Sequence, residues 1–245
     1  LSGKIPFCCT FGVFASGRAW EQIRLAAAYM NLNITIGGTH GGVLVGADGA
    51  THQALEEITL MRVLPNMSIV VPADALEAER ATIAAASKES PVYLRLGREK
   101  MPQLMSEDDE FEIGKARLIQ EGKDLTIIAC GVMVFHAIQA SEMLKEEGIE
   151  AGVINLHTIK PIDKAAILKA ASRTGAIVTA EEHLLAGGMG SAVSEVLIQE
   201  CPVPVEMVGV SDRFGESGLP WELMNHLNLM PKDIIDATKR VLQRK

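Results

Sequence analysis

The sequence has 245 residues, with 23 Lys and Arg against 31 Asp and Glu, which gives a formal net charge of −8. This acidic balance argues against nucleic-acid binding, which requires a basic face, and no apolar run reaches the roughly 20 residues that a membrane span needs. The length fits one large or two modest domains, and a hydrophobic content of 48% is enough for a sizeable core.

The cysteines and the N-terminus indicate the cellular setting. No two cysteines form a CxxC pair, so we expect four buried, reduced thiols in a cytoplasmic protein; they are Cys8, Cys9, Cys130 and Cys201. The start, LSGKIPFCCTF, lacks an initiator Met and is not typical of a signal peptide. We therefore expect that the sequence was cut from a longer one.

Strand-like and helix-like segments alternate through the first hundred residues. In segment 18–31 four apolar residues can share one helical face, and Asp74 is placed to cap the helix that follows it. On that helix we expect Glu77, Glu79 and Arg80 to form a solvated face. The alternation predicts a parallel sheet with helices on both faces. The predicted strands are 5–11 (buried), 34–38, 68–72 and 91–99, and the predicted helices are 18–31, 52–64 and 75–88.

A polar segment with the acidic run 107–110 then separates two α/β series. We interpret residues 106–120 as a linker between domains 1–105 and 121–245, with a long surface loop as the alternative. The second series predicts another mostly parallel sheet flanked by helices. Its predicted strands are 124–131, 150–156, 175–182 and 203–210, and its predicted helices are 134–147, 162–172, 190–200 and 231–242.

Residues 37–53, GGTHGGVLVGADGATHQ, have neither helical nor alternating periodicity. They follow a predicted strand, and in open parallel sheets ligands bind beyond the carboxyl ends of strands. Glycines allow close backbone approach, while His40, His52 and Asp48 offer imidazole and carboxylate groups for proton transfer and sugar hydroxyls. Asp48 and Thr51 could instead simply cap the next helix. A metal site is the weaker option, because a third ligand at a suitable spacing is missing.

Several motifs closely resemble the pyrimidine-binding domain of transketolases. They are TFGVF (10–14), the loop 37–53, LPNMSIVVPAD (64–74) and LRLGRE (94–99). From about Gly114 the chain looks like the transketolase C-terminal domain, including EEH (181–183) and FGESG (214–218). The resemblance covers essentially the whole chain. It implies an N-terminally truncated thiamine-diphosphate-binding fold followed by that C-terminal domain, as in the C-terminal subunit of split transketolases.

The resemblance also implies an activity and the residues that carry it. Transketolases use thiamine diphosphate and Mg²⁺ to pass a two-carbon glycolaldehyde unit from a ketose phosphate to an aldose phosphate, a reaction of the pentose phosphate pathway. By motif, His40 and His52 match the histidines that contact donor hydroxyls and the reacting carbonyl. Asp48 matches the carboxylate that recognises a sugar hydroxyl. Arg98 matches the phosphate-binding arginine, a role that its forked donors suit, with Arg95 the less favoured candidate.

Phe11 and Phe14 match the aromatic residues that pack against the aminopyrimidine ring, although the pattern alone favours ordinary core packing. Where the family often has a further aromatic residue, this chain has Gly17 and Arg18. The cofactor-activating glutamate of the family precedes the strand that corresponds to residues 5–11, and the diphosphate and metal ligands belong to the other half. We therefore expect that this chain supplies no metal ligand and needs an N-terminal transketolase half, in a homodimer or a heterotetramer, for activity.

Rival functions remain open. A 1-deoxy-D-xylulose-5-phosphate synthase shares the GADG and THQ motifs, and a 2-oxo acid dehydrogenase β subunit is a further thiamine enzyme; His40 and Arg98 favour transketolase. A non-catalytic partner subunit is the third possibility. The Gly-rich segment 186–193 could bind an anion at a helix start, but we expect close packing there. We expect His183 to make an interface or interdomain hydrogen bond, and treat His136, His157 and His226 as structural.

Overall fold

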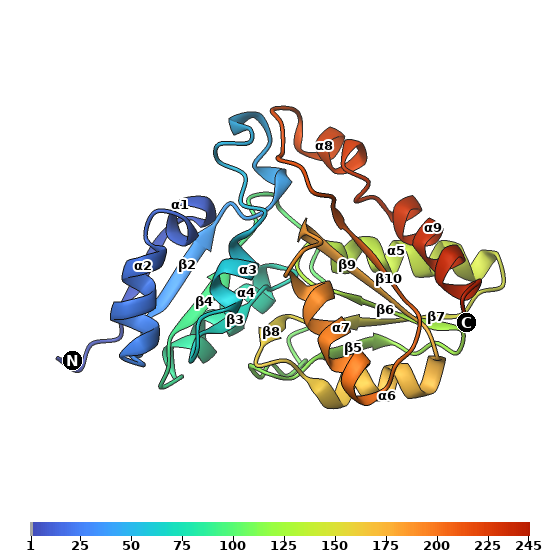
Figure 1. Cartoon of the computed structure of the whole chain (residues 1–245), viewed down its shortest axis with the longest axis horizontal. Helices are drawn as coiled ribbons and strands as arrows, with labels where there is room; N and C mark the ends of the chain where they lie inside the picture. Colours follow the sequence, from blue (N-terminus) through green and yellow to red (C-terminus); the bar gives the residue numbers. More distant parts are fainter. Residues whose placement is uncertain (1) are drawn as a thin grey trace.

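Two five-stranded sheets, each covered by helices on both faces, lie side by side in the computed structural model of the chain, which describes residues 2–245 (Figure 1). The predicted class, two consecutive α/β units with mostly parallel sheets, is confirmed. None of the helices in this described part is long and apolar enough to cross a membrane.

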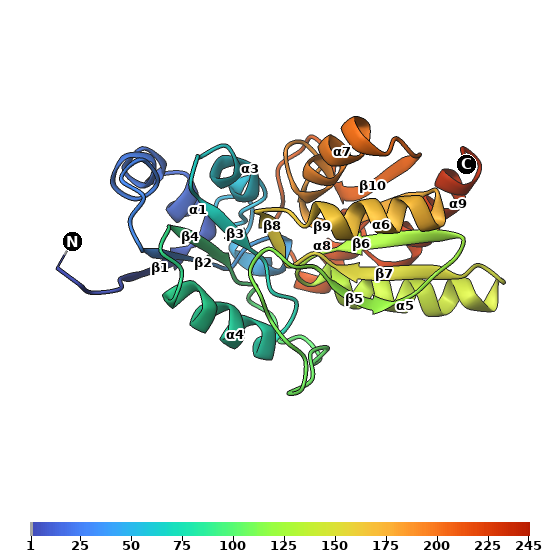
Figure 2. The same ribbon diagram turned by 90° about the horizontal axis from the view of Figure 1, so that it is seen from below.

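The first sheet has the order β1-β2-β4-β3-β8 and is parallel except for β8, which runs antiparallel to β3. Figure 2 shows α1 and α3 on one face and α4 on the other. The strands are β1 (Phe7–Phe11), β2 (Thr35–Thr39), β3 (Ser68–Val70), β4 (Val92–Arg95) and β8 (Thr158–Lys160). The helices are α1 (Gly12–Ser16), α2 (Trp20–Gln22), the π-helix η1 (Ile23–Tyr29), the 3₁₀ segment η2 (Val43–Asp48), α3 (Glu57–Arg62) and α4 (Ala75–Ala86).

The second sheet has the order β10-β9-β6-β7-β5, and only β5 is antiparallel, at one edge. Helices α6 and α7 cover one face, and α5 and α9 cover the other (Figure 2). The strands are β5 (Arg117–Gln120), β6 (Leu125–Ala129), β7 (Ala151–Asn155), β9 (Ile177–Leu184) and β10 (Val205–Val210). The helices are α5 (Met133–Glu146), α6 (Lys164–Thr174), α7 (Met189–Glu200), α8 (Pro220–His226) and α9 (Pro231–Leu242).

The expectation that residues 5–11 form a buried strand is wrong. Strand β1 is the edge of the first sheet and, within residues 2–245, pairs only with β2, so its side chains stay accessible, with Phe7 42% exposed. Cys8 and Cys9 are exposed and Cys201 is half-buried, and only Cys130 is buried as expected. No disulfide joins any of the four cysteines, which all lie in the described part of the chain, and the reduced state stays a prediction.

The segment between the two series packs against the first unit. One Asp74 carboxylate oxygen accepts the predicted cap bond from the backbone amide of Glu77, and the other accepts from the amides of Leu104 and Met105, at 2.6 Å each. The last residues of 106–120 form the edge strand β5, which the linker interpretation missed. The division into domains 1–105 and 121–245 stays a proposal.

The expected solvated face on α4 is wrong for Glu77. Its side chain is buried, where it accepts a hydrogen bond of 2.8 Å from the Asn155 amide and one of 2.6 Å from the Ala73 backbone amide. Asn155 ends β7, 78 residues further along the chain. Glu77 therefore joins α4 to the second sheet, a contact that no local pattern can indicate.

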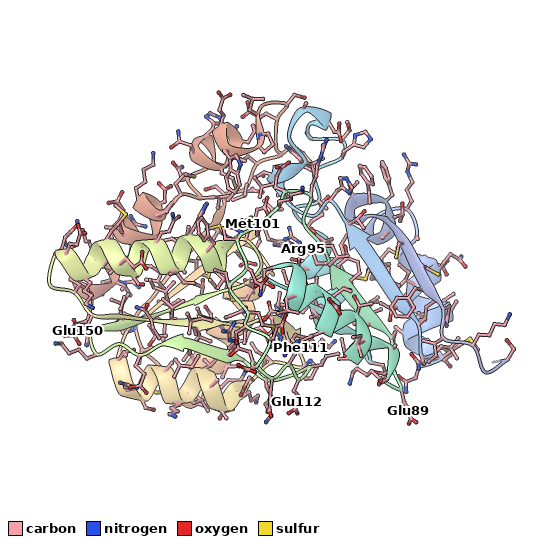
Figure 3. All side chains as sticks on the ribbon, turned by 180° about the vertical axis from the view of Figure 1, so that it is seen from behind. Glu89, Arg95, Met101, Phe111, Glu112 and Glu150 are labelled. Atoms are coloured by element: carbon pink, nitrogen blue, oxygen red, sulfur yellow. The ribbon has the colours of Figure 1, made fainter. Side chains whose placement is uncertain are left out.

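Arg95 lies between the two sheets (Figure 3), where it forms a buried ion cluster with Glu57 and Glu182. Arg95, at the end of β4 and 4% exposed, donates to the Glu57 carboxylate at 2.5 Å and to the Glu182 carbonyl at 2.8 Å. The Glu182 carboxylate lies 4.0 Å from the Arg95 guanidinium. Burial acts to lower the pKa of Arg95, but the two carboxylates outweigh it and raise that pKa. The cluster thus keeps a cation in the interior by surrounding it with acceptors.

His157, which follows β7, is a structural histidine as predicted. Its ring is buried, stacks on Phe111 with centroids 4.4 Å apart, and bonds through Nδ1 with the Thr158 hydroxyl at 2.9 Å. Burial, and secondarily the charge of Arg117, lowers the pKa of His157 from 6.5 to about 4.

Because the folded state holds the His157 proton less tightly than the unfolded state, stability should fall as pH drops from 6.5 towards 4. The loss amounts to at most about 3 kcal/mol. The measurement is urea unfolding at several pH values for the wild type and His157→Gln. We expect the variant to have lost part of this acid sensitivity, whatever its packing costs; parallel pH curves for the two proteins would contradict the assignment.

Replacing Arg95 by Met should strongly destabilise the fold, because it leaves the Glu57 and Glu182 carboxylates buried without their cation. The expected loss is roughly 3–5 kcal/mol in the free energy of unfolding. Arg240→Met is the matched control, since Arg240 pairs with Glu206 while being 56% exposed, and exposed pairs contribute about 0–1 kcal/mol. Equal denaturation midpoints for the two variants would show that the buried cluster is unimportant for stability.

Candidate functional site

The parallel register of the first sheet brings three sequence segments to one edge. Phe11, the last residue of β1, is level with Thr39, the last residue of β2, and Gly38 is level with Arg95 at the end of β4. The chain continues from each strand into a predicted motif: TFGVF, the loop 37–53, and LRLGRE. Motifs that are far apart in the sequence therefore meet at the carboxyl edge, where ligands of open parallel sheets bind.

Two aromatic rings and two imidazoles form one cluster at this edge. The rings of Phe11 and His40 stack with centroids 4.0 Å apart and planes 9° apart. His52 meets the rings of Phe11 and Phe14 edge-on, at 5.9 and 5.3 Å. All four side chains are half-buried. Because Nδ1 of each histidine is bonded to the hydroxyl of the preceding Thr, at 3.0 Å for His40 and 2.9 Å for His52, Nε2 is the ring atom free to face a ligand.

Asp48 and Arg98 form an ion pair beside this cluster. Their charged atoms are 3.3 Å apart and each side chain is 41% exposed. Arg98 also donates to the Val45 carbonyl at 2.5 Å, which fixes it against the loop. The pair offers a carboxylate and a forked donor group at the molecular surface, where hydroxyl and phosphate groups can reach both.

The charges of this pair also act on His40. Burial lowers the pKa of His40, the positive charge of Arg98 lowers it further, and Asp48 opposes them. The lowered pKa favours the neutral imidazole of His40, which can accept a hydrogen bond at one ring nitrogen and donate one at the other. Its backbone has φ of 58°, a left-handed conformation that is uncommon outside glycine. The structure thus brings together the four residues predicted to contact substrate.

The loop that carries His40 and Asp48 is held by the second unit of the chain. Residues Val43 and Leu44 are buried in the hydrophobic cluster of the second sheet, and their segment η2 packs against α8 (Figure 1). The Gln53 amide donates to the Glu216 carbonyl at 2.9 Å, within the FGESG motif. The chain turns at Gly46, which has φ of 74°, so that Val43–Val45 enter the core while Asp48 stays exposed.

Other predicted residues have structural positions. Arg95 lies in the buried ion cluster and not beside Asp48, which agrees with its lower rank as a phosphate ligand. The guanidinium carbon of Arg18 lies 4.5 Å above the Phe14 ring, a cation–π contact that sequence reasoning missed. Among residues 2–245 no three His, Cys, Asp or Glu side chains are grouped to hold a metal ion; that the chain supplies no metal ligand stays a prediction.

Residues of the EEH motif make structural hydrogen bonds that the sequence did not predict. Glu181 accepts from the backbone amides of Met189 and Gly190, at 2.6 and 2.8 Å, and so occupies the start of α7 with a carboxylate. The close packing expected for the Gly-rich segment 186–193 is confirmed, because a Cβ added to Gly188 would lie 2.3 Å from Glu181 Oε2 and one added to Gly190 would lie 2.6 Å from Thr179 Oγ1. His183 is fully buried with Nδ1 on the Leu184 carbonyl, and its Nε2 lies 3.9 Å from Glu57 of the first unit.

Comparison with known proteins gives two family matches that together span most of the chain. Residues 1–103 match the transketolase pyrimidine-binding domain, and residues 114–234 match the transketolase C-terminal domain. A "6-deoxy-6-sulfo-D-fructose transketolase subunit" from Clostridium sp. (strain MSTE9) is 43% identical over 99% of this chain and 76% of its own length. One subunit of an "Apulose-4-phosphate transketolase" from Phocaeicola vulgatus is 44% identical over 93% of this chain and 73% of its own.

A solved structure has the same fold throughout. It is described as a "Split gene transketolase, inactive beta4 tetramer", superposes with a TM-score of 0.94 and is 48% identical, covering 99% of this chain and 78% of its own. Both domain matches, the relatives and this structure agree. The chain therefore belongs to the transketolase family and contains its pyrimidine-binding domain followed by its C-terminal domain.

Proposed function

We propose that this chain is the C-terminal subunit, or half, of a thiamine-diphosphate-dependent transketolase that moves a two-carbon glycolaldehyde unit from a ketose phosphate to an aldose phosphate. The observation that carries the proposal is the convergence of His40, His52, Asp48 and Arg98 beside two aromatic rings at one sheet edge. The relatives that are named as transketolase subunits support the class of enzyme.

The residues present fit the pyrimidine half of the cofactor. Phe11 and Phe14 lie near-parallel, with ring planes 17° apart and centroids 6.0 Å apart, and both are half-buried at the open edge of the sheet. Such faces suit a flat heteroaromatic ring, and offset contacts between rings contribute about 0.5–1.5 kcal/mol beyond burial. When bound, thiamine diphosphate supplies the carbon nucleophile that cleaves the ketose. Its diphosphate and the Mg²⁺ ion would be held mainly by the partner half.

The polar residues of this chain have separate tasks in the proposal. His40 and His52 bind the hydroxyl and carbonyl oxygens of the donor through Nε2, and an imidazole at that position can take part in proton transfer. Asp48 accepts a hydrogen bond from a sugar hydroxyl. Arg98 donates in parallel to the phosphate oxygens. Because the two latter side chains are exposed and already adjacent, an extended sugar phosphate can reach both ends of the pair.

The proposed partner is an N-terminal transketolase subunit, in a homodimer or heterotetramer of cytoplasmic location. The names of the relatives specify subunits, which supports a split enzyme. A deoxyxylulose-phosphate synthase or a 2-oxo acid dehydrogenase β subunit would both act on 2-oxo acids. An assay of pyruvate decarboxylation beside ketose-to-aldose transfer, in the reconstituted complex, separates them. A non-catalytic partner subunit would give neither activity.

His52→Ala and Asp48→Ala should each lower two-carbon transfer at least about 10-fold in the complex with the N-terminal subunit, thiamine diphosphate and Mg²⁺, because each removes a polar contact to the donor. Thermal unfolding should be almost unchanged for Asp48→Ala, since its ion pair is exposed. Full turnover in both variants would remove the site assignment.

Arg98→Ala should raise KM for phosphorylated acceptors about 10-fold or more, since it removes a charge-assisted bidentate contact, and should leave KM for unphosphorylated sugars nearly unchanged. Arg240→Ala, remote from the loop, is the control for the general effect of losing an exposed Arg. Equal changes in KM for phosphorylated and unphosphorylated acceptors would exclude a phosphate-binding role.

A further inference from the structure

We infer that Glu182, on β9 of the C-terminal domain, is a positioning residue that holds the loop carrying His40 and Asp48 in its working geometry. This inference rests on the proposed function for its kinetic consequences. The structural part concerns only how the two domains of this chain contact each other.

The Glu182 carboxylate acts directly on the backbone of the loop. Its Oε1 accepts the backbone amide of Leu44 at 2.8 Å, between His40 and Asp48 in the sequence. Gly42 has φ of 87°, and a Cβ built on it would lie 2.1 Å from the Glu182 carboxyl carbon. The loop therefore approaches this carboxylate so closely that only glycine fits at residue 42.

The other side of Glu182 is fixed from the first domain. Its carbonyl accepts from Arg95 Nη2 at 2.8 Å, and its carboxylate lies 4.0 Å from Nη1. Arg95 is bound in turn to Glu57 on α3. Burial raises the pKa of Glu182 to about 7, although Arg95 and the amides of Leu44 and Val43 act to lower it. These contacts leave the carboxylate of Glu182 little freedom, so it can act as a rigid acceptor for the loop.

The position of His40 depends on this anchor through a short, continuous path. The Gly41 amide donates to the Leu96 carbonyl at 3.1 Å, and the Gly42 amide donates to the Ala54 carbonyl at 2.8 Å. After these two bonds, the next residues enter the second domain at Leu44, where Glu182 receives them. Loss of this acceptor would leave a buried amide without a partner and free the loop to shift. Displacements of about 1 Å at a reacting group can cost on the order of 100-fold in rate.

Glu181 provides an unusually close control. It is the adjacent residue, equally buried, and accepts two backbone amides, but these belong to α7 and not to the loop. The two carboxylates lie on the same strand, and removing either one leaves buried backbone amides without an acceptor. Only the Glu182 change should reach the site.

The test compares Glu182→Ala, Glu182→Gln and Glu181→Ala in the reconstituted complex, by steady-state kinetics and by hydrogen–deuterium exchange of the peptide spanning 41–54. For Glu182→Ala we expect kcat to fall between about 10-fold and 100-fold and exchange in 41–54 to accelerate. Glu182→Gln, which keeps a carbonyl acceptor for the loop while an NH2 group replaces the other carboxylate oxygen and the charge is lost, should restore kcat to within about 3-fold of the wild type. For Glu181→Ala we expect faster exchange at the start of α7 with kcat near the wild-type value.

The two readouts separate the possible failures. Unchanged exchange in 41–54 for Glu182→Ala would overturn the positioning role, as would equal losses of kcat in Glu181→Ala and Glu182→Ala. Faster exchange in 41–54 together with no two-carbon transfer in the wild-type complex would instead refute the proposed function and leave the loop contact standing. If Glu182→Ala does not fold, Glu182→Gln and Glu182→Asp provide the test. Because Asp is shorter, Glu182→Asp should have the faster exchange in 41–54 and the lower kcat of the two. The reverse order would overturn the positioning role.

Discussion

The buried guanidinium of Arg95 is the constraint on which the arrangement of this chain depends. A cation in the interior is stable only where acceptors surround it, and here these come from α3 and from β9 of the other domain. Meeting this requirement fixes the end of β4, the start of α3 and one strand of the second sheet relative to each other. Because the loop 39–53 runs between these elements, its course follows from the same requirement.

The helices and strands were predictable where one face of a segment is buried and the hydrophobic periodicity is uninterrupted. The ends of α9, and the positions along the chain of most strands in both series, agree with those predicted from the hydrophobic pattern. Four kinds of feature were not accessible. Strands β8 and β5 were not predicted, because β8 is only three residues long and β5 lies in a polar segment. Helix α3 starts at Glu57, later than predicted, because the chain first turns through 49–53. The exposure of β1 depends on its place in the sheet order, which the local sequence does not indicate.

At the candidate site, the sequence identified the polar residues but not the contacts that support them. The residues that meet there were identified because polar groups in a glycine-rich loop have no use in packing, and the sheet register explains why three motifs far apart in the chain converge. Most of the support around them was not visible in the sequence. The contact of Arg18 with Phe14 joins residues only four apart, a spacing that could have indicated it, but Glu182 reaches Leu44 across 138 residues of chain. Contacts of this range depend on how two sheets dock, and no periodicity or spacing reports it.

Strand β8 has a consequence for how the chain can be divided. It belongs by sequence to the C-terminal domain, yet it completes the first sheet by pairing with β3, and the Lys160 ammonium binds the carbonyls of Arg62 and Leu64. Separating the two family domains would remove β8 from β3, which would keep β4 on its other side, and would leave an edge of unpaired backbone amides and carbonyls. The boundary between the two family domains therefore does not coincide with the boundary between the two sheets.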